Sequence, residues 1–159
     1  MIKVHIPGDG HITPTFVGFQ WNPFSDSKKR KTIEDAIHIL KHNVKGMRPC
    51  NDCFQRLPNG RTFDDILEDS SIFVSFDPNN TGNLFGATLG NDVTITDFSI
   101  RMGKWTTAAT LVHELAHVNG APGNDHQAEG TLLCCGFSNI HDATIIGAVS
   151  GSRGNTRVA

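Results

Sequence analysis

The chain has 159 residues, of which 19% are charged and 38% hydrophobic, and its formal net charge is −2. This length is typical of one domain with a hydrophobic core, and the near-zero charge gives no support for a nucleic acid or an anionic membrane as partner. No stretch has the apolar length of a transmembrane helix, and the N-terminal MIKVHIPGDG lacks the apolar core of a secretory signal peptide. We therefore expect no nucleic-acid partner and no membrane partner.

The first third of the chain predicts one strand and one helix. Weak alternation over 2–7 predicts an edge strand, and the Pro-, Gly- and Ser-containing stretch 11–31 predicts irregular structure. An apolar stripe at helical spacing then predicts a helix over 32–45. Thr32 and Asp35 are spaced as a capping box at its start.

The middle of the chain predicts a loop, a short helix and three strands. The loop covers 47–60 and the short helix 62–68. The strands are predicted from their apolar and β-branched residues over 71–76, 84–89 and 93–96. Gly90, Asn91 and Asp92 form a hairpin turn between the last two strands.

The most informative stretch is His113-Glu114-Leu115-Ala116-His117, an H-E-x-x-H pattern. On an α-helix, positions i and i+4 share a face, so His113 and His117 can present two imidazole nitrogens to one metal ion. Glu114 lies about 100° further around the helix, where its carboxylate can reach a water molecule at that ion. The pattern predicts a metal-binding helix. The alternative is a buried amphipathic helix whose histidines only form hydrogen bonds with neighbours.

Flanking residues support the helix itself. Thr106 or Thr107 is a suitable N-cap, and Gly120 followed by Pro122 is a stop signal. An apolar side that would bury the helix is supplied by Leu111, Val112, Leu115 and Val118. A second helix is predicted over 127–135.

A catalytic zinc site needs a third protein ligand and an open position. The candidates downstream of the Gly120–Pro122 turn are Asp125, His126 and Glu129.

The stretch Thr106 to Gly130 resembles zincin-type metallopeptidases, which are named for such H-E-x-x-H helices. It departs from the metzincin pattern, because Gly123 occupies the position of the third histidine. It is closer to the aspzincin pattern, in which a turn leads to G-T-x-D-x-x-Y-G. In that alignment His126 replaces the aspartate ligand and Glu129 replaces the tyrosine that stabilises the transition state. The segment more loosely resembles the H-E-L-x-H-x-x-G-A-P of small bacterial metallopeptidase toxin domains.

The resemblance implies roles for several residues. His126 is favoured as third ligand because neutral imidazole suits zinc, and Asp125 would then hold a ligand in place. Glu129 would be a fourth ligand or a neighbouring carboxylate. Because the chain contains no tyrosine, another side chain must stabilise the oxyanion, and His141 is a candidate. The family also implies a strand beside the active-site cleft, for which the region 84–96 is the candidate.

Four cysteines occur in two clusters, Cys50 with Cys53 and Cys134 with Cys135. They could form disulfides between the clusters, a structural zinc site, a redox C-x-x-C pair or reduced structural thiols. We favour two disulfides that join the 50–53 loop to the helix after the metal turn. Such bonds would place the protein in an oxidising environment, whereas reduced cysteines would indicate the cytoplasm. Without a signal peptide, an oxidising location implies another export route or a domain taken from a larger protein.

We expect a single α+β zincin-like domain over 1–150, with a small mixed or antiparallel sheet packed on the H-E-x-x-H helix, and a flexible tail over 151–159. The expected function is hydrolysis of peptide bonds with one zinc ion per chain and Glu114 as general base. The substrate would be a protein or peptide, with an inhibitor or immunity protein as a further partner and a secreted bacterial effector or toxin as the setting. The alternatives are a peptidoglycan-peptide hydrolase, a non-catalytic zinc-stabilised binding module and a thiol oxidoreductase.

Overall fold

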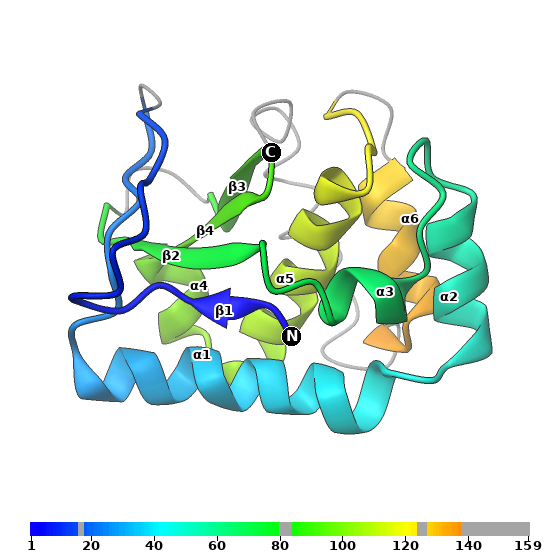
Figure 1. Cartoon of the computed structure of the whole chain (residues 1–159). Helices are drawn as coiled ribbons and strands as arrows, with labels where there is room; N and C mark the ends of the chain where they lie inside the picture. The colour runs from blue at the N-terminus through cyan, green and yellow to red at the C-terminus, as the bar shows by residue number, and fades with distance from the viewer. Residues whose placement is uncertain (16–17, 80–83, 124–126, 138–159) are drawn as a thin grey trace.

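A computed structural model describes residues 1–15, 18–79, 84–123 and 127–137. Within these ranges the chain forms six α-helices, one π-helical segment and a four-stranded mixed sheet, which together make a single α+β domain (Figure 1). The expected α+β class is thus confirmed. The predicted tail over 151–159 lies outside the described residues.

The sheet has the strand order β1-β2-β4-β3. Its strands are β1 (Lys3–Val4), β2 (Phe73–Asp77), β3 (Gly86–Leu89) and β4 (Asp92–Thr96). β2 is parallel to β1 and β4, whereas β3 and β4 are antiparallel. The hairpin between β3 and β4 turns at Gly90, whose φ of 62° suits a two-residue turn. The four predicted strands are confirmed, although β1 is shorter than the predicted 2–7.

The long helix α1 spans Ser27–Ile39 and continues into the π-helical segment Leu40–Val44. The predicted start at Thr32 is wrong. The N-cap is Asp26, whose carboxylate accepts hydrogen bonds from the backbone N–H groups of Lys28 and Lys29. The Thr32 hydroxyl instead donates to the carbonyl group of Lys28, one turn back.

Three short helices complete the frame. α2 spans Arg48–Gln55 and corrects the predicted loop: Pro49 lies at the start of the helix, where proline is favoured, and Cys50 and Phe54 bury one side. α3 (Phe63–Leu67) confirms the predicted short helix, and its N-cap is Thr62. α4 (Asp97–Arg101) was not predicted and follows β4 directly.

The helix α5 spans Lys104–Val118, and α6 spans Gln127–Cys134. The N-cap of α5 is Gly103, not Thr106 or Thr107. The Thr107 hydroxyl donates to the carbonyl of Gly103, within the first turn of the helix. The prediction of α6 is confirmed.

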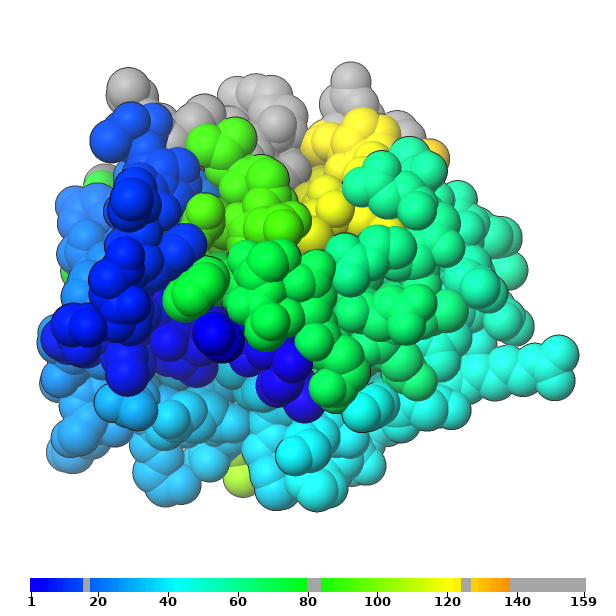
Figure 2. All heavy atoms as spheres, in the orientation of Figure 1, coloured from blue at the N-terminus to red at the C-terminus, as the bar shows by residue number. Residues whose placement is uncertain are grey.

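α5 is the central element of the domain. It contacts α1, α3, α4 and α6 as well as β3 and β4. In Figure 1 the sheet lies to the left, α1 runs along the lower edge, and α2, α3 and α6 are grouped to the right. Figure 2 shows the segment after α5, in yellow, reaching the surface between the green strand region and the green-cyan segment after α2. In the described residues no helix is long and apolar enough to span a membrane.

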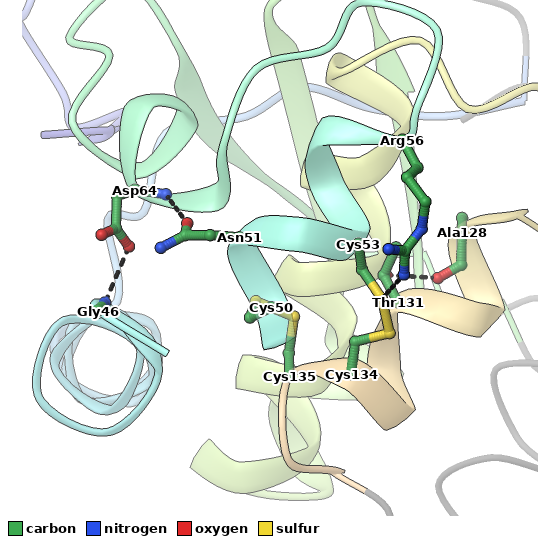
Figure 3. Close-up of a disulfide and its surroundings, with 10 residues drawn as sticks. All are labelled: Gly46, Cys50, Asn51, Cys53, Arg56, Asp64, Ala128, Thr131, Cys134 and Cys135. Carbon is green, nitrogen blue, oxygen red and sulfur yellow. Dashed lines mark hydrogen bonds between the residues drawn. A yellow bond between two sulfur atoms is a disulfide. The ribbon is translucent and has the colours of Figure 1, made fainter. Parts of the chain in front are cut away.

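Two disulfides join α2 to α6, Cys50–Cys135 and Cys53–Cys134 (Figure 3). They confirm the predicted pairing between the two cysteine clusters. Disulfides are typical of proteins in oxidising compartments, so this finding agrees with the expected location outside a reducing cytoplasm.

Candidate metal centre

The helix α5 carries the H-E-x-x-H residues into the interior of the domain. Every residue from Thr106 to Val118 is buried, because α5 is surrounded by the sheet and by other helices. The exposed fractions are only 2% for His113, 1% for Glu114 and 8% for His117. Buried ionisable groups require partners or a function, so these three side chains form a candidate site.

The two histidine rings converge as the i,i+4 spacing predicts. The Nε2 atoms of His113 and His117 are 3.2 Å apart. Nδ1 of His117 lies 2.6 Å from the carbonyl oxygen of Ala121. A carbonyl can only accept, so this Nδ1 is the protonated nitrogen, and Nε2 carries the lone pair. The hydrogen bond therefore orients His117 as a ligand through Nε2.

The turn after α5 supplies this carbonyl group. Gly120 has a φ of 94°, a left-handed conformation that favours glycine, and the N–H of Ala121 bonds to the carbonyl of Ala116. Asn119 is fully buried and anchors the turn: its Nδ2 donates to the carbonyl groups of Phe54 and Arg61, each at 2.8 Å. The end of α5 is thus fixed against the segment between α2 and α3.

His113 is held without a hydrogen bond to Nδ1 from any described residue. Burial and, to a smaller extent, the neighbouring His117 together lower the pKa of His113 to about 3. The ring is therefore neutral at neutral pH, which is the form that binds metal ions.

Glu114 is positioned by strand β3. Its Oε1 lies 2.9 Å from the hydroxyl of Thr88, which donates to it, and its Oε2 lies 3.8 Å from Nε2 of His113. The pKa of Glu114 is raised to about 8, mainly by burial; the hydrogen bond from Thr88 acts in the opposite direction, and the charge of Glu129 acts in the same direction as burial. Oε1 of Glu114 is thus held by Thr88 of β3, and Oε2 lies on the side of His113.

Gly86 allows the close approach of β3 to α5. A Cβ atom at this position would lie 2.7 Å from the carbonyl oxygen of Thr94 and 3.3 Å from Cγ of Glu114. Neither the adjacent strand nor the buried glutamate leaves room for a side chain. Thr88, Gly86 and Asn119 were not identified from the sequence, because each contributes through the fold and not through a local motif.

The predicted third ligands are only partly covered by the structure. Glu129 lies in the first turn of α6, and its charge acts on Glu114. Asp125, His126 and His141 lie outside the described residues. In the part of the chain that the structure describes, no group of three or more His, Cys, Asp or Glu side chains is arranged to hold a metal ion. The described part of the candidate centre is a pair of possible ligands, His113 and His117, with the carboxyl group of Glu114 beside them.

No protein-family model, no curated protein and no solved structure matches this chain.

Proposed function

We propose that this protein is a zinc-dependent hydrolase of the zincin type that cleaves peptide bonds. The observation that carries the proposal is the buried pair of imidazole Nε2 atoms of His113 and His117, 3.2 Å apart, beside the carboxyl group of Glu114. A structural pair of core histidines would not need a buried carboxyl group, held by a separate strand, next to it.

The donor set suits zinc. Two nitrogen ligands at about 2.0–2.1 Å from a tetrahedral zinc ion lie about 3.3–3.4 Å apart, close to the separation between His113 and His117. Both rings offer a lone pair, since His113 is neutral and His117 is oriented by Ala121. His126 is the proposed third ligand, with Asp125 and Glu129 as alternatives. A bound zinc ion would polarise the carbonyl group of a substrate and lower the pKa of a water molecule to about 7.

Glu114 is the proposed general base. The Thr88 hydroxyl occupies Oε1, which leaves Oε2, on the side of His113, to take a proton. Burial raises the pKa of Glu114 above the ordinary value of a carboxyl group. A zinc ion bound beside it would be a neighbouring positive charge that lowers this pKa again and favours the carboxylate form, which can accept a proton and pass it to the leaving amine.

A peptide substrate is supported by the position of β3. This strand lies at one edge of the described sheet, its Thr88 donates a hydrogen bond to Glu114, and a Cβ atom on its Gly86 would lie 3.3 Å from Cγ of Glu114. No described strand pairs with the side of β3 that faces away from β4, and an extended peptide that pairs there would bring its backbone close to Glu114. The two disulfides favour an exported protein, for which a secreted bacterial effector with a cognate inhibitor or immunity protein is the proposed setting.

The test combines zinc content with peptide cleavage in four proteins: wild type, Glu114→Gln, His126→Ala and His42→Ala. We expect about one zinc ion per chain both in wild type and in Glu114→Gln. Of these two proteins, only wild type should cleave unfolded protein substrates. His126→Ala should lose most of the zinc. His42→Ala is the matched control, because His42 is exposed on the π-helical segment and should keep both zinc and activity.

The outcomes separate the alternatives. A wild-type protein that neither contains zinc nor takes it up would overturn the proposal and leave α5 as a structural helix. Zinc retained by His126→Ala would assign the third ligand to Asp125 or Glu129. Zinc without cleavage of any protein substrate would favour the binding module, unless peptides containing D-residues are cut, which would favour a peptidoglycan-peptide hydrolase.

A further inference from the structure

The two disulfides between α2 and α6 differ in exposure. Cys50 and Cys135 are buried, whereas Cys53 and Cys134 are half-buried. Figure 3 shows the two bonds close together between the same pair of helices. Thiol–disulfide exchange requires an attacking thiolate to reach a sulfur atom, so an external thiol has access to Cys53–Cys134 and not to the buried bond.

A positive charge contacts the accessible bond. Nη2 of Arg56 donates a hydrogen bond to Sγ of Cys53 at 3.2 Å, and Figure 3 shows the guanidinium group lying over this disulfide. Arginine is charged at any physiological pH, and a neighbouring guanidinium stabilises a thiolate. Negative charge released on Cys53 during exchange would therefore be stabilised, and a sulfur that leaves as a stabilised thiolate leaves faster.

A cavity provides space beside this sulfur atom. It has a volume of about 330 Å³ and is lined by Cys53, Arg56, Leu57, Gln127, Gly130 and Thr131. A thiolate on Cys53 would face this cavity, in contact with water and with Arg56. The outer disulfide therefore differs from the inner one in its exposure and in the positive charge beside it.

We propose that Cys53–Cys134 is an exchange site for low-molecular-weight thiols such as glutathione, with Arg56 selecting Cys53 as the leaving group. The thiolate of the small molecule forms a bond to Sγ of Cys134. The bond between Cys134 and Cys53 breaks, and its electron pair remains on Cys53 as a thiolate beside Arg56. The product is a mixed disulfide on Cys134, while Cys50–Cys135 stays intact.

A second molecule of the thiol can complete a two-electron reduction. It attacks the sulfur of the first molecule in the mixed disulfide, which releases Cys134 and forms the oxidised small-molecule disulfide. This site does not depend on the proposed hydrolysis, and α6 would remain tied to α2 by Cys50–Cys135 throughout.

The experiment treats the folded protein with reduced glutathione, stops the exchange with acid, blocks free thiols by alkylation and assigns each cysteine by peptide fragmentation. We expect glutathione on Cys134 and alkylation on Cys53 while Cys50 and Cys135 remain bonded. Arg56→Gln should slow the opening of the outer bond about threefold to tenfold.

The matched control is Arg48→Gln, which removes the same charge at the first residue of α2, whereas Arg56 is the C-cap residue of that helix. Arg48 pairs with Asp52 and not with a sulfur atom. This variant should react at the wild-type rate, and thermal unfolding would show that all variants are folded. Equal opening of both disulfides would overturn the proposed site. Glutathione on Cys53, or a rate in Arg56→Gln equal to that of Arg48→Gln, would overturn the role of Arg56.

Discussion

Glu114 shows how single residues from different elements make the candidate centre. The residue lies on α5, but the hydroxyl group that holds its carboxyl comes from Thr88, 26 residues earlier in the chain. The same hydroxyl lies 3.1 Å from the backbone carbonyl of Glu114, so Thr88 ties β3 to both the side chain and the main chain of the helix. A buried carboxyl group without such a partner would be costly, which makes Thr88 part of the centre.

The contact between Gly86 and Glu114 gives a prediction at this scale. Gly86→Ala places a methyl group 2.7 Å from the carbonyl oxygen of Thr94 and 3.3 Å from Cγ of Glu114, so the backbones of β3 and β4 must shift and Glu114 loses space. We expect the free energy of unfolding to fall by about 1–3 kcal/mol. Urea denaturation measures this loss, and the rate of peptide cleavage should fall with it.

Gly130→Ala is the control for the same chemical change. Gly130 lies inside α6, is exposed, and has no atom within 4 Å of an added Cβ. Because alanine is the better helix former, we expect stabilisation by about 0.5–1 kcal/mol. Stabilisation of both variants would contradict the tight packing at Gly86.

The H-E-x-x-H motif could be recognised from the sequence because it is local. His113, Glu114 and His117 lie within five consecutive positions, and helical geometry alone brings the two rings together. The residues that position them could not be predicted in this way. Asn119 is next to the motif, but it anchors the end of α5 by donating to the carbonyl groups of Phe54 and Arg61, and only the tertiary fold brings these groups near.

At the scale of elements, the sequence predicted the types of most helices and strands but placed several helix boundaries incorrectly. α2 was predicted as loop because Pro49 and two nearby cysteines suggest irregular structure, whereas proline at a helix start is favourable. α1 was predicted to begin five residues too late, because its first turn is a run of polar and basic residues without an apolar stripe. Capping by Asp26 sets the true start.

The cap of α1 can be tested with two substitutions. Asp26→Ala removes the acceptor for the N–H groups of Lys28 and Lys29, and we expect the free energy of unfolding to fall by about 1 kcal/mol. Thr32→Ala lies in the second turn, where alanine is the better helix former, and should change stability by less than about 0.5 kcal/mol. Chemical denaturation of both variants would detect the difference, and a larger loss in Thr32→Ala would support the originally predicted cap.

At the scale of the whole molecule, the two disulfides close almost the same loop. Cys50–Cys135 spans 85 residues, and Cys53–Cys134 spans 81 residues of the same segment. In the chain-entropy model, a single bridge over a loop of this size adds about 4.5 kcal/mol to the free energy of unfolding. With one bridge present, the second closes only the short ring between the two bonds, for which the same model gives about 2 kcal/mol.

The first bridge to be removed should therefore cost less free energy of unfolding than the second. Cys53→Ala combined with Cys134→Ala should lower the free energy of unfolding by about 2 kcal/mol, because Cys50–Cys135 still closes the long loop. Replacing all four cysteines should lower it by about 6–7 kcal/mol. Urea denaturation of the two variants and wild type measures both steps. Two equal losses near 4.5 kcal/mol would mean that the bridges act independently, and would exclude the shared loop as the source of their effect.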